Sequence, residues 1–276
     1  MYGLINKILN YSAVDGPGNR LVIFFQGCNF NCSYCHNPET INICKNCEIC
    51  VKTCHSKALS IKNSKVIWHS EKCVHCDMCI KVCPHSSSPK VLKMTVAEIM
   101  QRIEKVRPFI SGITISGGEC TQQFDFLMDL LIECQMRNIS AFIDTNAFLE
   151  HEKMQTLSKY FDKAMPDVKV FNNSQHIELT GKSNEIVLQN VEYLLQKNKI
   201  YEIRTVIYPN LNNEETVTEV SKLIAKYNKN VIYKLIKFRP NGTRQKLNEN
   251  LQETSDETMI YLKNIVEKNG VNMVIV

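Results

Sequence analysis

The sequence lacks any long apolar run. No run within its 276 residues approaches the ~20 consecutive apolar residues that a membrane-spanning helix needs. The stretch 1–14 has only short apolar patches, interrupted by Asn6, Lys7, Asn10 and Ser12, without the apolar core and cleavage site of a secretory signal. Glycine and proline are few, at 10 and 8 residues, so neither a fibrous repeat nor disorder is indicated. We therefore expect a globular cytoplasmic protein with no membrane partner.

Cysteine, by contrast, is abundant. The chain has 13 cysteines, and without a secretion signal these indicate metal ligands rather than disulfides, because cytosolic thiols stay reduced. Cys28, Cys32 and Cys35 follow the apolar run 21–25 at C-x3-C-x2-C spacing. Such a loop can hold three corners of a [4Fe-4S] cubane, which leaves the fourth iron open to chelate the amino and carboxylate groups of S-adenosylmethionine (SAM). The alternative is a zinc knuckle that either lacks its fourth ligand or takes it from His36.

Eight further cysteines fall in the segment 42–90, which differs in character from the rest of the chain. They form two C-x2-C-x2-C-x3-C runs, the second ending in Cys-Pro and the first in Cys-His. The doubled pattern is similar to bacterial two-cluster ferredoxins, in which the fourth cysteine of each run ligates the other cluster. Two zinc sites are the alternative. The similarity implies one cluster on Cys44, Cys47, Cys50 and Cys83, and another on Cys73, Cys76, Cys79 and Cys54.

The formal charge of +5 does not indicate a nucleic-acid partner. It counts cysteines as neutral, whereas two four-thiolate clusters at about −2 each and one three-thiolate cluster at about −1 would bring the loaded protein to roughly zero. Lysines and arginines are also scattered along the chain rather than gathered in a stripe. We expect no nucleic-acid partner.

Outside this segment, strand and helix patterns alternate. Helix patterns include one capped by Thr95-x-x-Glu98. Alternating strands and helices predict an α/β fold with a parallel sheet. About 230 residues remain once the cysteine-rich segment is removed, enough for six βα units of a barrel. We predict a barrel domain of residues 1–41 and 91–276 with an insert at 42–90. The predicted strands are 21–26, 112–116, 141–145, one near 165–169, 201–208 and 231–238, before a last strand at 271–276.

Two motifs beside the three-cysteine loop carry a family resemblance. Asp15-Gly16-Pro17-Gly18-Asn19-Arg20 precedes the loop, and Cys35-His36-Asn37-Pro38 ends it. Together they resemble the signature of the glycyl-radical-enzyme activating enzymes, a branch of the radical SAM superfamily that includes pyruvate formate-lyase activating enzyme. The short form with a doubled insert most resembles the YjjW-type group. The resemblance implies an open partial (β/α)6 TIM barrel of the radical SAM type with an inserted ferredoxin-like domain.

The resemblance also assigns SAM-binding residues. Ser116-Gly117-Gly118-Glu119 is similar to the motif that meets the methionyl amino group, although a strand-to-helix turn is the alternative for two glycines at a strand end. Arg239 stands where better-known members have a histidine that contacts the adenosyl group, and arginine could stack there instead. The implied SAM-binding set is Tyr34, His36, Gly117, Gly118, Glu119, Lys169, Arg204 and Arg239.

Two further motifs are similar to those around a monovalent cation beside the SAM carboxylate. They are Asp144-Thr145-Asn146-Ala147, where Ala147 replaces the family's glycine, and Met165-Pro166-Asp167-Val168-Lys169. Oxygen ligands suit a hard cation such as Na⁺ or K⁺, which would offset repulsion between carboxylates. A helix cap or surface charge is the alternative for each acid. The implied ligands are Asp144, Thr145, Met165 and Asp167.

The resemblance finally implies a reaction and its partners. A cluster on the catalytic cysteines Cys28, Cys32 and Cys35 would cleave SAM to a 5′-deoxyadenosyl radical, which takes a hydrogen atom from a glycine of a partner glycyl radical enzyme. Asp15 and the Gly16-Pro17-Gly18 turn are candidates for contacting the partner. The insert clusters would relay electrons from flavodoxin or ferredoxin to a monomeric activase. The alternatives are another radical SAM enzyme acting on a small molecule or peptide, and a ferredoxin-type electron carrier.

Three residues receive no such role. Cys120 and Cys134 are expected to be packed side chains, because neither has partner cysteines at ligand spacing. His176 lies in a stretch, His176-Ile-Glu-Leu-Thr180-Gly181, that also resembles the activating enzymes. We expect His176 to be structural or part of the partner surface.

Overall fold

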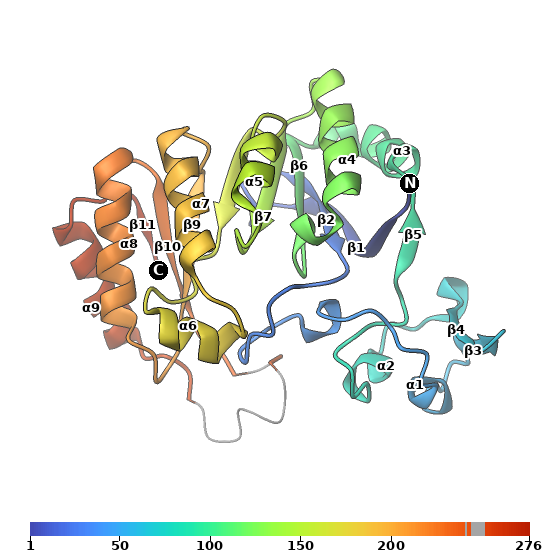
Figure 1. Ribbon diagram of the computed structural model, residues 1–276. Helices are drawn as coiled ribbons and strands as arrows, with labels where there is room; N and C mark the ends of the chain where they lie inside the picture. The colour runs from blue at the N-terminus through green and yellow to red at the C-terminus, as the bar shows by residue number, and fades with distance from the viewer. Residues whose placement is uncertain (241, 244–251) are drawn as a thin grey trace.

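The computed structural model describes residues 1–240, 242–243 and 252–276 (Figure 1). Its strands are β1 (Gly3–Ser12), β2 (Arg20–Phe25), β3 (Leu59–Lys62), β4 (Lys65–Trp68), β5 (Leu92–Met94), β6 (Gly112–Gly117), β7 (Ala141–Thr145), β8 (Lys163–Pro166), β9 (Glu202–Ile207), β10 (Ile232–Lys237) and β11 (Val274–Ile275). Its α-helices are α1 (Ile49–Lys52), α2 (Met78–Lys81), α3 (Val96–Val106), α4 (Phe124–Met136), α5 (His151–Leu157), α6 (Asn173–Thr180), α7 (Glu185–Gln196), α8 (Asn213–Tyr227) and α9 (Asp256–Lys268). Short 3₁₀ helices are η1 (Pro38–Thr40), η2 (Ser70–Lys72), η3 (Arg107–Phe109) and η4 (Cys120–Gln123).

A run of parallel strands forms the main wall, in the order β2-β6-β7-β8 and then β9-β10. The two groups join through parallel bridges from Ala164 to Ile200 and from Asp167 to Arg204. Helices connect successive strands, and Figure 1 shows α4, α5, α7 and α8 along one side of them. The predicted α/β fold with a parallel sheet is therefore confirmed.

Side-chain alternation along these strands separates the core from the cavity. Ile115 and Ile143 are fully buried in the main core with helix residues such as Leu127. The next side chains along the same strands, Ser116 and Asp144, line a cavity on the opposite face. Because successive side chains of a strand point to opposite faces, one face packs against the helices and the other carries polar groups.

An antiparallel edge precedes the parallel wall and was not among the predicted strands. Strand β1 pairs with β2, with Ile5 opposite Phe25, and β5 pairs with β1 on its outer side. In β1 only Gly3 and Ile5 are buried, and the strand from Asn6 onward is partly or fully exposed, as at Lys7. At the other end, β11 covers only Val274–Ile275 of the predicted 271–276.

The segment 42–90 lies beside the wall, with α1, α2 and the β3-β4 hairpin (Figure 1). It has its own small core, built on Cys50, Leu59 and Cys79. The buried amide of Gln26, at the end of β2, ties its entry to the wall by donating to the carbonyl oxygens of Glu39 at 2.8 Å and Asn42 at 2.7 Å. No helix in the described ranges is long and apolar enough to cross a bilayer.

Candidate active site

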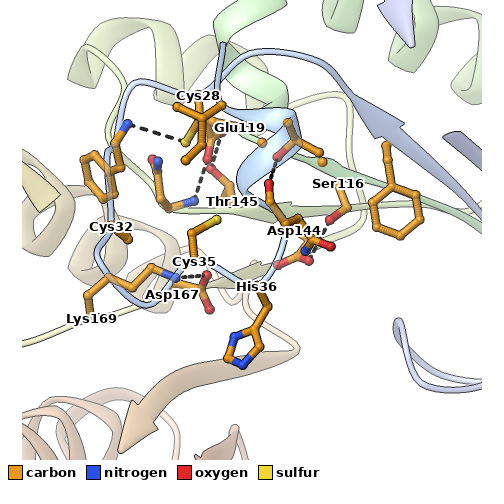
Figure 2. Close-up of a pocket in the computed structure, with 18 of the residues that line it drawn as sticks. Cys28, Cys32, Cys35, His36, Ser116, Glu119, Asp144, Thr145, Asp167 and Lys169 are labelled. Atoms are coloured by element: carbon orange, nitrogen blue, oxygen red, sulfur yellow. Dashed lines mark hydrogen bonds and ion pairs between the residues drawn. The ribbon is translucent and has the colours of Figure 1, made fainter. Parts of the chain in front are cut away.

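The three-cysteine loop follows β2 and is fixed by backbone hydrogen bonds on both sides. Before it, Cys28 N donates to the carbonyl oxygen of Ile41 at 2.9 Å. Within it, Asn31 N donates to the carbonyl oxygen of Thr180 at 2.9 Å. The loop thereby lies across the carboxyl ends of the strands. Its three thiols line one cavity of about 280 Å³, in which Figure 2 labels Cys28, Cys32 and Cys35.

The donors around this cavity fit an iron–sulfur cluster with a polar ligand. Burial raises the pKa of Cys28 to about 12 and that of Cys32 to about 11, so thiolates there need a strong positive charge, which iron supplies. The Tyr34 hydroxyl is also buried in the cavity wall, with no hydrogen-bond partner among the described residues. A buried orphan hydroxyl is costly unless a ligand reaches it.

The zinc alternative receives no support from the geometry. No group of three or more Cys, His, Asp or Glu in the described residues converges on a point where one metal ion could bind. In a cubane each thiolate binds a different iron, so convergence is not required. The predicted fourth zinc ligand, His36, instead has its Nε2 2.9 Å from the carbonyl oxygen of Arg239.

Glu119 joins the ends of β6 and β7 below the cluster loop. Its carboxylate, 1% exposed, accepts hydrogen bonds from the Thr121 amide and hydroxyl, the Thr145 hydroxyl and the Asn146 amide at 2.6–3.0 Å. Burial raises its pKa, and these hydrogen bonds oppose the rise. Glu119 therefore acts first as a brace between strand ends.

The two preceding glycines are required by close backbone approach. A Cβ on Gly117, which has φ +126°, would lie 2.3 Å from the backbone of Phe25. A Cβ on Gly118 would lie 2.4 Å from the carbonyl oxygen of Gly27. The glycines therefore form the close strand-to-helix turn that brings β6 against the start of the cluster loop, and their role in SAM binding stays a prediction.

The predicted cation ligands come together, but with cationic side chains as their partners. The Asp144 carboxylate lies 3.1 Å from Arg204 Nη1, and Arg204 Nη2 donates to the Met165 sulfur at 3.3 Å. Asp167 lies 2.5 Å from Lys169 Nζ. The fourth predicted ligand, Thr145, donates to Glu119 as described above. The four residues therefore do not present a set of uncommitted donors to Na⁺ or K⁺.

Acidic and basic side chains are paired in this region. Burial raises the pKa of Asp144, and Arg204 opposes that rise. Burial alone would lower the pKa of Lys169, but the neighbouring Asp167 and Tyr34 raise it well above its usual range. Ser116, which had no predicted role, adds a hydrogen bond of 2.9 Å to Asp144. The cavity is thus lined by acidic and basic side chains that hydrogen bonds and ion pairs hold in place (Figure 2).

Arg239 does not reach the cavity with its guanidinium, which corrects the predicted adenosyl contact. Its side chain is 73% exposed and lies 3.5 Å from the Glu253 carboxylate. Only the Arg239 carbonyl oxygen approaches the site, at His36. The ion pair with Glu253 accounts for the outward orientation. Arg204 likewise lies behind Asp144 rather than among the lining residues.

Three residues outside the predicted SAM-binding and cation-binding sets also contribute. Asn146 Nδ2 donates to Asn29 Oδ1 at 2.7 Å, which connects the end of β7 to the cluster loop. Asp15, which was predicted only to contact a partner, lines the same cavity as the thiols. The sequence did not predict the hydrogen bond between the two asparagines, because asparagine is common in loops. The pairing follows only once the end of β7 is known to lie beside the cluster loop.

The cysteines of the insert surround two further small cavities. The first is lined by Cys44, Cys47, Cys50, Cys79 and Cys83. The second is lined by Cys54, Cys73, Cys76 and Cys79. Each cavity holds the first three cysteines of one run and the fourth of the other, and Cys79 lies between them. The structure thus brings together the two crossed sets that the ferredoxin similarity implies.

Comparison with known proteins agrees with this site. A model of the Radical SAM superfamily matches residues 22–223. The choline trimethylamine-lyase activating enzyme of Oleidesulfovibrio alaskensis is 34% identical over 77% of this chain and 74% of its own. The trans-4-hydroxy-L-proline dehydratase activating enzyme of Clostridioides difficile is 30% identical over 99% of this chain and 98% of its own. The chain therefore belongs to the radical SAM superfamily and, within it, to the glycyl-radical-enzyme activating enzymes.

Solved structures support the fold. A domain of the pyruvate-formate lyase-activating enzyme from Bacteroides vulgatus has a TM-score of 0.52 at 21% identity, covering 60% of this chain and 99% of its own. QueE from Escherichia coli has a TM-score of 0.54 at 14% identity, covering 99% and 93%. Family membership implies that a [4Fe-4S] cluster and SAM are the cofactors, and the three-thiol cavity has the donors to hold them.

Proposed function

We propose that this protein generates the glycyl radical of a partner enzyme. The observation that carries the proposal is that one cavity is lined by the three-cysteine loop, by the ends of β6, β7 and β8, and by Asp15 of the Asp-Gly-Pro-Gly turn. When bound and reduced by one electron, the cluster with SAM supplies a 5′-deoxyadenosyl radical and methionine. That radical takes one hydrogen atom from a glycine Cα, which leaves 5′-deoxyadenosine and the partner's glycyl radical.

The chain's own residues hold and orient the reactants. Cys28, Cys32 and Cys35 would hold the cluster. Lys169 and Asp167, 2.5 Å apart at the end of β8, offer an ammonium and a carboxylate to the oppositely charged ends of the SAM methionyl group. The Tyr34 hydroxyl offers a hydrogen bond inside the wall. The polar face of the strands behind them is braced by Glu119, so the reactive groups need little reorganisation.

We further propose that residues 42–90 form a ferredoxin-like insert with two [4Fe-4S] clusters, so that the loaded protein holds three. The two crossed cysteine sets around separate cavities support this assignment. Cys47 and Cys76, one from each set, are exposed, so each cluster would have an edge near the surface. An electron from flavodoxin or ferredoxin could enter there.

Three other expectations remain predictions. The Na⁺ or K⁺ beside SAM is not needed for this proposal, because Asp144 and Asp167 already have Arg204 and Lys169 as ion-pair partners. The cytoplasmic location and the monomeric state rest on the sequence arguments alone.

The test is anaerobic. The protein is reconstituted with iron and sulfide, reduced and given SAM, and 5′-deoxyadenosine is measured for wild type, Cys32→Ala and Cys134→Ala. Cys134 is a matched control because it is buried in the main core, away from the cavity. We expect product from wild type and Cys134→Ala only. A glycyl-radical EPR signal after a candidate partner is added would then establish the activation.

The rival functions give different outcomes. No 5′-deoxyadenosine from fully loaded wild type would favour an electron carrier of the ferredoxin type. Product formation, with SAM turnover driven by a small molecule and no radical on any glycyl radical enzyme, would favour another radical SAM reaction.

A further inference from the structure

His176 is a fully buried histidine that the proposed reaction does not use. It lies in α6, 1% exposed, with its Nδ1 2.7 Å from the carbonyl oxygen of Lys182. A carbonyl only accepts, so Nδ1 carries the proton and donates. The other ring nitrogen, Nε2, has no hydrogen-bond partner among the described residues. Burial lowers the pKa of His176, which agrees with a neutral ring.

The end of α6 supports the cluster loop directly. A helix leaves its last four carbonyl oxygens without partners inside the helix. Two of these carbonyls in α6, on Leu179 and Thr180, accept hydrogen bonds from Ser33 N at 3.2 Å and Asn31 N at 2.9 Å. Both donors lie between the first and last cysteines of the loop. The position of the loop backbone therefore depends on where the end of α6 points.

His176 determines how that helix ends. The chain leaves α6 through Gly181 in a left-handed conformation, φ +81°, and Gly181 N donates to the carbonyl oxygen of Ile177 at 2.8 Å. The hydrogen bond from His176 Nδ1 to Lys182 holds the chain beyond this turn against the helix. The Thr180 hydroxyl assists, since it donates to the His176 carbonyl oxygen at 2.8 Å and accepts from Lys182 N at 3.2 Å.

The His176 ring also contacts the loop itself. It packs edge-to-face with Phe30, with centroids 5.4 Å apart and an interplanar angle of 78°. Phe30 is 2% exposed, lies between Cys28 and Cys32 in the sequence, and also packs against Phe148 at 5.5 Å. The ring thus touches the segment between two of the three thiols.

We propose that His176 is a positioning residue for the cluster loop. Its Nδ1–H fixes the end of α6 through the hydrogen bond to Lys182. The carbonyl oxygens there accept from Asn31 N and Ser33 N, and these two hydrogen bonds fix the loop backbone between the three thiols. The inference rests on the proposed function, because it assumes that this loop binds the SAM cluster. It assigns a role to the His176–Gly181 motif, which the reaction itself leaves unused.

Two substitutions separate the hydrogen bond from the packing. His176→Asn keeps an N–H donor near the Nδ1 position, whereas His176→Phe keeps a ring against Phe30 and loses the donor. His151→Phe is a matched control. The Nδ1 of His151 lies 2.8 Å from Asn190 Oδ1, and its ring packs edge-to-face with Tyr193 at 5.3 Å, but it does not contact the loop.

Two measurements are made on the reconstituted full-length protein. The first is the affinity for SAM, followed together with the change that SAM causes in the EPR signal of the reduced cluster. We expect His176→Phe to bind SAM about five- to tenfold more weakly, as for loss of one buried hydrogen bond, with an altered SAM-dependent EPR signal. His176→Asn and His151→Phe should both stay close to wild type.

The second measurement is amide hydrogen exchange over residues 28–35 in the protein before cluster loading. We expect faster exchange there in His176→Phe, and unchanged exchange in His151→Phe. Unchanged exchange and unchanged SAM affinity in His176→Phe would overturn the proposal. So would equal losses in His176→Phe and His151→Phe, which would indicate general destabilisation. If wild type itself showed no SAM-dependent signal, the proposed function would fail, while the exchange data would still decide whether His176 positions the loop.

Discussion

The Thr145 hydroxyl and the Glu119 carboxylate, 2.8 Å apart, join the carboxyl ends of two neighbouring strands beneath the cluster loop. The same carboxylate accepts from Asn146 N, and Asn146 in turn holds Asn29 in the loop. A chain of buried hydrogen bonds therefore runs from β6 through β7 to the thiol-bearing segment. Disturbing one member should affect both the stability of the fold and the geometry of the site.

Glu119→Gln tests this brace. The amide NH₂ of glutamine would face the Asn146 N–H, so a buried donor would lose its acceptor at a cost of about 1–3 kcal/mol in the free energy of unfolding. Urea unfolding measures the change. Glu133→Gln, which removes a surface ion pair with Arg137 at 3.2 Å, is the control and should cost less than about 1 kcal/mol. Equal effects would contradict the brace.

Arg204→Gln tests the buried ion pairs. Arg204 lies 3.1 Å from Asp144 and 2.5 Å from Glu202, and removing it leaves two buried carboxylates without their cation. We expect a loss of about 3–5 kcal/mol in the free energy of unfolding, because an unpaired buried charge is strongly unfavourable. Arg137→Gln serves as the exposed counterpart. Full stability of Arg204→Gln in urea would show that the pair is not buried as described.

Double cysteine variants test the crossing in the insert. Cys44→Ala with Cys83→Ala removes two ligands of one cavity, so about four iron atoms per chain should be lost. Cys54→Ala with Cys83→Ala removes one ligand from each cavity and should cost about eight. Iron analysis and EPR measure both. If the second pair lost no more iron than the first, each run would be holding its own cluster.

Cys134 gives a prediction for pH. Burial raises the pKa of its thiol to about 12, with Glu133 adding to the rise, whereas an unfolded cysteine titrates near about 8.5. The folded pKa is the higher one, so the stability from the neutral thiol is complete below about pH 8.5 and declines as pH rises toward the folded value. Between about pH 7.5 and about pH 9.5, wild type should lose about 1.4 kcal/mol more than Cys134→Val. Urea unfolding at the two pH values measures this difference. If wild type and Cys134→Val lost the same free energy of unfolding, the Cys134 thiol would be accessible to water in the folded protein.

Asp15 gives a prediction for the partner. Its carboxylate accepts from Ser12 Oγ at 2.5 Å and lies in the wall of the cavity, within reach of an entering peptide. Asp15→Asn should raise the KM for the partner about tenfold, as expected when a charged hydrogen-bond acceptor is lost. It should leave 5′-deoxyadenosine formation without partner unchanged. A fall in that partner-free reaction would instead place Asp15 in SAM binding.

Much of the architecture could be predicted because it depends on patterns within a few consecutive residues. The strand 141–145 matches its expected bounds, and β6 at 112–117 is one residue longer than the expected 112–116, because each is an apolar run with a turn signal at its end. The capping box at Thr95 and Glu98 begins α3 as predicted, since its hydrogen bonds join residues three apart. The β1 strand was not predicted, because polar residues interrupt its apolar pattern and its register against β2 shifts twice.

The candidate site was predictable in its members but not in their pairings. Spacing alone places Cys28, Cys32 and Cys35 on one short loop. It gives no indication that Arg204 faces Asp144, or that the Arg239 guanidinium turns outward to Glu253. Those choices depend on which strands are neighbours and on how deeply each charge is buried.

By itself the sequence determined which cysteines stand at cluster spacing and where the parallel strands and their connecting helices lie, because thiol spacing and hydrophobic period act over a few residues. Only the tertiary structure decided which carboxylate meets which cation, and that the end of α6 holds the cluster loop. Asn31 and Thr180 are far apart in the chain, and their hydrogen bond forms only when the strands between them have packed side by side. Short-range sequence patterns thus identify the candidate cysteine ligands, and long-range packing determines where they lie.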